Sequence, residues 1–225
     1  MKLTLHNSHS WDLSPREARQ LQQELRTQIR VQPLHDESIR TIGGVDASFD
    51  KQKIYAAAVV LDYHSLEKVE QASAEEPLIF PYIPGLLSFR ETPAYLEALA
   101  QLNALPDVLM VDGHGVAHPR RFGIACHLGV LLDLPAIGCA KSILLGEADP
   151  LDESRGSTAE IKLDGEVLGL ALRTRDNVKP VYVSVGHRVD LPSATRIALA
   201  SGRGYRLPEP ARQAHLLTQS IKSHK

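Results

Sequence analysis

The chain has 225 residues, 43% of them hydrophobic, which is enough for a substantial buried core, and we expect one domain over residues 1–225. A formal net charge of −2 excludes a globally basic nucleic-acid-binding protein, so contact with a polyanion would need a local cluster such as Arg120 and Arg121. No apolar run reaches membrane-spanning length, and two cysteines are too few for a disulfide framework, so we expect a soluble, cytoplasmic protein without a membrane partner.

The first third of the chain predicts one helix followed by an antiparallel meander. Ser14 as N-cap and Pro15 at the first helical position open a helix that extends to Arg30. Short polar connectors between the next three segments favour β-hairpins. The three predicted strands cover residues 40–50, 53–63 and 66–76.

Helices and strands alternate in the rest of the chain. The proline-punctuated loop "FPYIPGLLSFRE" leads into a helix from about Glu91 to Leu102, and the apolar stretch "DVLMVD" predicts a central strand that ends at Asp112. Together these patterns predict an α/β fold: a mixed central sheet with helices on both faces, compatible with a ribonuclease-H-like arrangement. The remaining predicted elements are a helix from Pro119 to Asp133, strands over 134–142 and 179–188, a hairpin over 159–174 that turns at Asp164–Gly165, and helices that open at Ser193 and Pro208.

Two acidic residues stand where strands would bring them together. Asp46 lies inside the first strand and Asp112 at the end of the fourth, and Glu91 could reach them from a helix. Three carboxylates at one point repel one another unless a cation lies between them, and Mg²⁺ accepts such oxygen ligands while keeping waters and a substrate oxygen. The alternatives are ordinary ones: Asp112 as a turn residue and Glu91 as a first-turn acid that favours the helix dipole.

Other reactive side chains allow further interpretations. Asp112, His114 and His118 could be taken as zinc ligands, but no second pair completes a tetrahedral set. Lys141 follows a buried strand and is either a phosphate contact or a solvated lysine. Tyr82, stiffened by neighbouring prolines, is either an exposed ring that stacks on bases or a core tyrosine.

Several stretches of the chain together resemble the endonuclease V family of deoxyinosine 3′ endonucleases, and the match is close to the bacterial enzymes. The order and spacing of "PYIPG…FRE" and "DGHG…HPR" are the most specific features. The stretches that carry the resemblance are "GGVDASF", "PYIPGLLSFRE", "DVLMVDGHGVAHPRRFGIACHLG", "IGCAKS", "VSVGHR" and "GYRLPEP".

The resemblance implies a ribonuclease-H-like fold and a DNA-repair hydrolase that uses Mg²⁺, with Mn²⁺ also tolerated. Such an enzyme cuts the second phosphodiester bond 3′ to an inosine and leaves 3′-hydroxyl and 5′-phosphate ends. Mainly RNA cleavage and inosine binding without catalysis remain the alternatives, and a monomer is expected. By motif, the resemblance implies metal ligands Asp46, Glu91 and Asp112, with His215 as an additional metal-site contact; catalytic contacts Lys141 and His118; and substrate contacts Pro81, Tyr82, Ile83, Gly85, Leu87, Gly113, His118 and Gly138.

Overall fold

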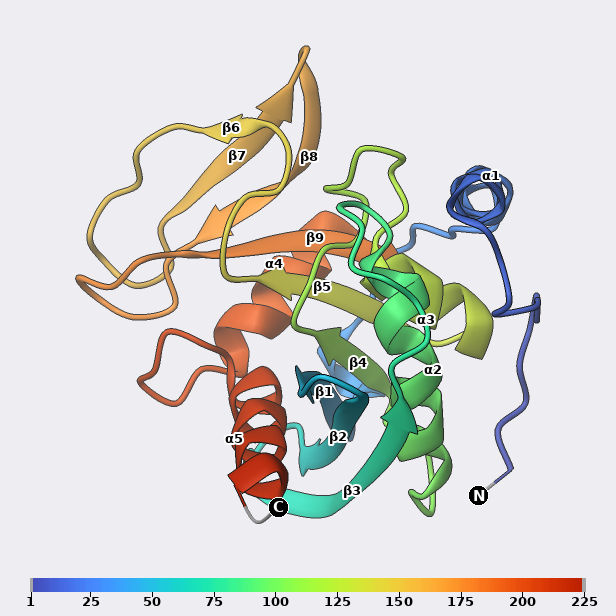
Figure 1. Cartoon of the computed structure of the whole chain (residues 1–225). Helices are drawn as coiled ribbons and strands as arrows, with labels where there is room; N and C mark the ends of the chain where they lie inside the picture. The colour runs from blue at the N-terminus through green and yellow to red at the C-terminus, as the bar shows by residue number, and fades with distance from the viewer. Residues whose placement is uncertain (1, 224–225) are drawn as a thin grey trace.

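The computed structural model describes residues 2–223, and within them one nine-stranded mixed sheet runs through the molecule (Figure 1). The strand order is β3-β2-β1-β4-β5-β9-β8-β7-β6. β1, β4 and β5 are parallel to one another, and every other neighbouring pair is antiparallel. The strands are β1 Thr41–Phe49, β2 Lys53–Asp62, β3 Lys68–Pro77, β4 Val108–Val111, β5 Ala136–Ala140, β6 Glu147–Ala148, β7 Thr158–Leu163, β8 Glu166–Leu172 and β9 Val181–His187.

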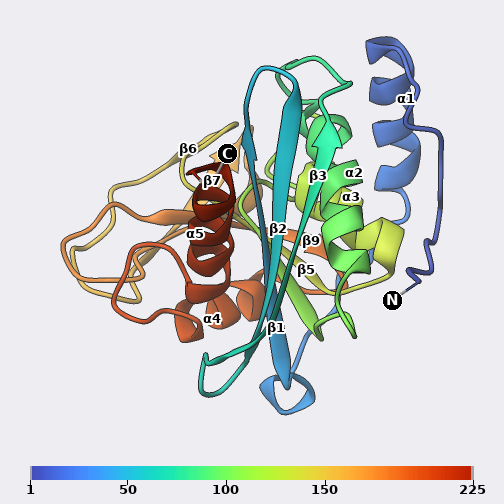
Figure 2. The same cartoon turned by 60° about the horizontal axis from the view of Figure 1, so that its bottom comes forward.

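Helices cover both faces of this sheet. α2 and α3 pack on one face, with α1 outside α3, and α4 and α5 pack on the other, as the edge-on view in Figure 2 shows. No helix within residues 2–223 combines the length and apolar character that crossing a bilayer would require. The helices are α1 Pro15–Arg26, the short 3₁₀ helix η1 Asp36–Ser38, α2 Leu87–Ala100, α3 Ile124–Leu132, α4 Leu191–Ala200 and α5 Glu209–Ser223.

Each face of the sheet has its own apolar core. Because side chains alternate along a strand, β1 contributes Ile42 to the core under α4 and α5 and Val45 to the core under α2 and α3. Gly44 lies between them, on the face towards α5. A Cβ atom on Gly44 would stand 2.0 Å from the carbonyl oxygen of Pro210, so α5 can lie directly against β1 only because this residue is glycine.

The meander, the alternation of helices and strands, and the Asp164–Gly165 hairpin are confirmed. Asp164 and Gly165 both have positive φ angles, 50° and 83°, as expected for the tight turn that joins β7 to β8. Ser14 forms the N-terminal capping box of α1 with Glu17. The two-residue strand β6 was not predicted, since so short a strand leaves no alternating pattern.

Several predicted helix boundaries are wrong. α1 ends at Arg26 and not at Arg30. The Arg30 amide donates to Nδ1 of His187 on β9 and therefore makes no helical hydrogen bond. α4 begins at Leu191 and not at Ser193, since the Asp190 side chain caps it by accepting from the Ser193 amide. α5 begins at Glu209, next to the predicted Pro208.

The starts of α2 and α3, which flank the candidate site, also differ from the prediction. α2 begins at Leu87, so Glu91 lies in its second turn and not at its start, and Pro93 is accommodated inside the helix. α3 begins at Ile124 and not at Pro119. Arg121 adopts φ 53°, which a right-handed helix does not permit, and the chain turns there before Gly123 caps α3.

Candidate active site

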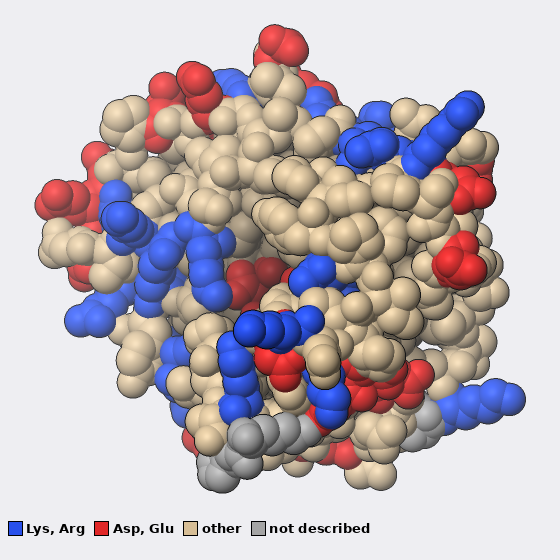
Figure 3. All heavy atoms as spheres, viewed as in Figure 1, with Lys and Arg blue, Asp and Glu red and all other residues tan. Residues whose placement is uncertain are grey.

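The register of β1 and β4 brings the two predicted aspartates together. These strands are parallel, with Val45 opposite Val111, so Asp46 and Asp112 are the next residues along the two chains. Glu91 reaches the same place from α2, and electrostatic repulsion from both aspartates acts on its carboxylate. Figure 3 shows acidic side chains in a hollow near the centre of this face, with Lys and Arg side chains along its left and lower sides. The structure therefore gathers the three carboxylates that the sequence singled out.

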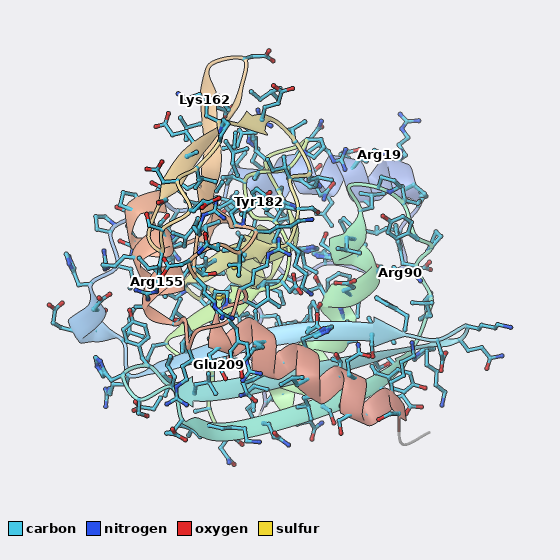
Figure 4. The ribbon with its side chains drawn as sticks, turned by 90° about the vertical axis from the view of Figure 1, so that its left-hand side faces the viewer. Arg19, Arg90, Arg155, Lys162, Tyr182 and Glu209 are labelled. Carbon is cyan, nitrogen blue, oxygen red and sulfur yellow. The ribbon has the colours of Figure 1, made fainter. Side chains whose placement is uncertain are left out.

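Asp46 is held from α5. Thr218 Oγ1 lies 2.8 Å from Asp46 Oδ2, and His215 Nδ1 lies 3.0 Å from the same oxygen. Because a carboxylate oxygen accepts, the proton of His215 is assigned to Nδ1, and Nε2 of the neutral ring keeps a lone pair. Figure 4 shows α5, whose first residue Glu209 is labelled, running across the strands that it packs against.

Glu91 and Asp112 are each contacted by one side chain. The Tyr95 hydroxyl, one helical turn further along α2, donates to Glu91 Oε2 at 2.9 Å, and the Lys141 ammonium pairs with Asp112 Oδ2. Burial, with repulsion from Asp46 and Asp112, raises the pKa of Glu91 to about 8. Burial likewise raises the pKa of Asp112, although Lys141 opposes the shift.

The donor set suits a hard divalent cation. Three carboxylates are concentrated in one largely buried place, where their negative charge is unfavourable until a cation compensates it. Asp46, Glu91 and Asp112 would be the oxygen ligands, and Nε2 of His215 could add a nitrogen. As the side chains stand, no three His, Cys, Asp or Glu residues within 2–223 form a finished coordination group, since Asp112 faces Lys141 and Asp46 faces α5.

A cavity of about 140 Å³ lies between the β3–α2 loop and the start of α3. Gly85 lines the cavity and has a φ of 78°, a backbone conformation that a residue with a side chain would disfavour. Five of the predicted substrate contacts line it: Tyr82, Ile83, Gly85, Leu87 and His118. The other lining residues are Gln22, Pro84, Ser88, His114, Gly123, Ile124 and Leu144.

Three predicted substrate contacts do not line this cavity. Pro81 is exposed on the loop beside it. Gly138 packs behind the wall, where a Cβ atom would stand 2.5 Å from the amide nitrogen of Gly115. A Cβ atom on Gly113 would stand 2.5 Å from the side chain of Ile124, which does line the cavity. These two glycines therefore shape the cavity through close packing.

His118 is committed to hydrogen bonds within the protein. Its Nδ1 accepts from the Arg120 amide at 3.2 Å, so the ring proton is assigned to Nε2, which donates to the Gly85 carbonyl oxygen at 3.0 Å. Burial, with the nearby Arg120 guanidinium, lowers the pKa of His118 to about 4, which keeps the ring neutral at pH 7. This geometry places His118 in the cavity wall, with both ring nitrogens in use.

The structure does not support the zinc interpretation, and it offers no reactive thiol at Cys126. Zinc ligation by Asp112, His114 and His118 would need a free ring nitrogen on His118, and both are occupied. Cys126 is completely buried, and burial raises the pKa of its thiol to about 12, so it is no thiolate nucleophile at neutral pH.

Tyr82 lies on the exposed loop that borders the cavity, with 70% of its surface accessible. The interpretation of this residue as a core tyrosine is therefore wrong. Arg90, labelled on α2 in Figure 4, fixes the loop by donating to the Phe80 carbonyl oxygen at 2.7 Å while its guanidinium lies over the Phe49 ring. The result is a large aromatic ring presented to solvent from a braced loop.

The sequence interpretation missed three side chains that contact site residues. Tyr95 follows Glu91 by four residues and Thr218 follows His215 by three, so helical spacing could have placed each beside its partner. Gln22 lies on α1, 63 residues from Gly85, and no local pattern connects it to the cavity.

Comparisons with known proteins identify one set of relatives. Residues 23–216 match the sequence model of the Endonuclease V family. The chain is 52% identical to Endonuclease V of Roseiflexus castenholzii over 93% of its own length and 94% of that protein. Its fold is similar to the crystal structure of Endonuclease V from Streptomyces avermitilis, with a TM-score of 0.91, 42% identity and 99% of each chain covered.

A second solved structure contains nucleic acid. Endonuclease V (D234N) of Ciona intestinalis, in complex with a 23mer DNA containing an inosine followed by a ribo-adenosine, matches with a TM-score of 0.84 and 28% identity, over 95% of this chain and all of that one. These structures share the ribonuclease-H-like arrangement, which confirms the predicted fold class.

Proposed function

This chain belongs to the endonuclease V family and is a nuclease, and we propose that it hydrolyses the second phosphodiester bond 3′ to a deoxyinosine in DNA. The products would carry 3′-hydroxyl and 5′-phosphate ends. Because deoxyinosine is the product of deoxyadenosine deamination, the enzyme would be a repair nuclease for deaminated adenine. We also propose that residues 1–225 act as a single domain. The observation that carries the proposal is the convergence of three carboxylates, from β1, from α2 and from the residue after β4, in a structure that also has a cavity bordered by an exposed tyrosine.

The carboxylates fit Mg²⁺, and Mn²⁺ would be tolerated by the same donors. When bound, the ion supplies Lewis-acid stabilisation of a phosphodiester and a more acidic water. Asp46, Glu91 and Asp112 would hold it, with His215 as a further ligand beside Asp46. Lys141, whose ammonium pairs with Asp112, would donate to phosphate oxygens of the substrate and so offset negative charge at the scissile bond.

Recognition of the base depends on taking it out of the duplex. An inosine pair is weaker than a normal pair, so the base is extruded at a lower cost. Tyr82 would fill the gap that remains in the stack, and the cavity beside it would receive the base. The Ciona relative was solved with inosine-containing DNA, which supports this class of substrate.

Mapping of the cleavage position tests the proposed function. Duplexes that carry one deoxyinosine or one deoxyadenosine at the same position, labelled at one end, are incubated with the protein with and without Mg²⁺. We expect one nick, at the second bond 3′ to inosine, only in the presence of the ion. Cleavage of a matched inosine-containing RNA as fast as the DNA would contradict the DNA assignment, and tight binding without any nick would leave only a base-binding protein.

The Tyr82→Ala variant tests the wedge. We expect the affinity for the inosine duplex to fall by about 5- to 150-fold, because stacking of a base on an aromatic ring contributes about 1–3 kcal/mol. Thermal stability should be unchanged, since the ring is mostly exposed. Fluorescence anisotropy with labelled duplex measures this, and Val69→Ala, an exposed apolar residue of β3, is the control. Unchanged affinity together with a large loss in the single-turnover rate would contradict the wedge assignment.

A further inference from the structure

We propose that Gln22, on the N-terminal helix α1, is a positioning residue for the base-binding cavity and contributes to the selection of inosine. The inference rests on the proposed function, because it assigns a role within the cavity that would receive the base. It adds α1 to the elements that determine specificity, although the carboxylates and the exposed tyrosine all lie on other elements.

Gln22 is almost fully buried, with 1% of its surface exposed, although the neighbouring residues of this amphipathic helix mostly face solvent. Its amide nitrogen donates to two backbone carbonyl oxygens, that of Gly85 at 3.1 Å and that of Phe122 at 3.0 Å. Gly85 belongs to the loop before α2 and Phe122 to the segment before α3. One side chain therefore joins the two segments that enclose the cavity.

The other end of the Gln22 amide is also used. Its Oε1 accepts from Arg120 Nε at 2.5 Å, and Nη2 of the same guanidinium donates to the Gly85 carbonyl oxygen at 2.5 Å. With Nε2 of His118, three donors converge on this one carbonyl. Hydrogen bonds from three different side chains to one carbonyl are compatible with few positions of that group, so they fix the backbone at Gly85.

The position of Gly85 matters because the loop on either side of it lines the cavity. Tyr82 precedes it by three residues and Leu87 follows it by two. Because glycine has no side chain, residue 85 could adopt several backbone conformations, and the converging donors favour the left-handed one that is observed, with φ 78°. Without the amide of Gln22 the loop should remain folded, but the cavity would lose the fixed wall that discriminates hypoxanthine from adenine.

The substitutions Gln22→Met and Gln22→Glu separate the hydrogen bonds that the Gln22 amide nitrogen donates from the one that its Oε1 accepts. Methionine of similar length removes all three hydrogen bonds. Glutamate keeps an acceptor for Arg120 but cannot donate to Gly85 or Phe122. Gln23→Met, at the exposed next position of α1, is the matched control.

Dissociation constants are measured in Ca²⁺ for matched duplexes with deoxyinosine or deoxyadenosine, and the ratio of the two is the readout. We expect Gln22→Met and Gln22→Glu to reduce the preference for inosine by about tenfold, which corresponds to about 1.4 kcal/mol. Gln23→Met should leave the ratio unchanged. Calorimetric titration of the free proteins with Mg²⁺ should give the same affinity for all variants, because Gln22 does not contact the carboxylates.

An unchanged ratio in Gln22→Met, or an equal weakening for both duplexes, overturns the inference, since a merely structural role would weaken both alike. An unchanged inosine preference in Gln22→Glu overturns the inference too, because the hydrogen bond with Arg120 alone would then be enough to maintain that preference. If Gln22→Met does not fold, Arg120→Met at a partly exposed position removes the neighbouring donor to Gly85 and must reduce the same ratio. Absence of any inosine preference in the unmodified protein would instead reject the proposed function itself.

Discussion

Replacement of Asp112 by asparagine is expected to reduce single-turnover cleavage of an inosine duplex by at least about a thousandfold. The substitution keeps the shape of the side chain and removes one of the three charges that would hold the cation. Lewis-acid stabilisation amounts to several kcal/mol, and every 1.36 kcal/mol changes a rate tenfold. Binding of the same duplex in Ca²⁺ should remain measurable, because the cavity and Tyr82 are untouched.

The Asp112→Asn experiment compares the rate in Mg²⁺ with the dissociation constant in Ca²⁺. Glu97→Gln, an exposed carboxylate on α2, is the control for a lost charge and should cleave at the normal rate. Mg²⁺-dependent nicking by Asp112→Asn at a rate close to that of the unmodified protein would show that Asp112 is not required as a ligand.

Replacement of Gly44 by alanine is expected to lower the free energy of unfolding by about 2–3 kcal/mol, which shifts the melting temperature of a chain this long by about 5–10 °C. The new Cβ atom would stand 2.0 Å from the carbonyl oxygen of Pro210 and 3.0 Å from the amide nitrogen of Ala211. Both are backbone atoms at the start of α5, so neither can turn away and the helix must move off the sheet.

The same displacement should weaken ion binding, because α5 carries His215 and Thr218 to Asp46, two residues beyond Gly44. Thermal unfolding and a Mg²⁺ titration of cleavage measure the two effects. Gly202→Ala is the control, since its Cβ atom would lie 3.3 Å from the carbonyl oxygen of Leu199, which a shift of a few tenths of an ångström relieves, and it should lower the melting temperature much less than Gly44→Ala. If Gly44→Ala melts at the temperature of the unmodified protein, the close packing of α5 on β1 is not required.

Local chemistry explains which parts of the fold could be predicted. The capping box of α1 and the Asp164–Gly165 turn each depend on a few neighbouring residues, and both are present as expected. Local chemistry also explains why the start of α2 was placed too late. Proline is disfavoured in the interior of a helix, so Pro93 argues against a helix that begins six residues before it. The structure accommodates Pro93 inside α2, whose residues Phe89, Tyr95 and Leu99 are buried on both sides of it.

The carboxylates were accessible to sequence reasoning because ionisable residues are rare in buried strands. The alternation of strands and helices was sufficient to predict the fold class, and the motifs were sufficient to predict the family. The cavity could not be predicted in this way, because it depends on the packing of residues far apart in the sequence, such as Gln22, Gly85 and Phe122. The tertiary structure also decided that His118 supports the cavity wall, since the hydrogen-bond partners of a side chain follow from packing, which no local pattern records.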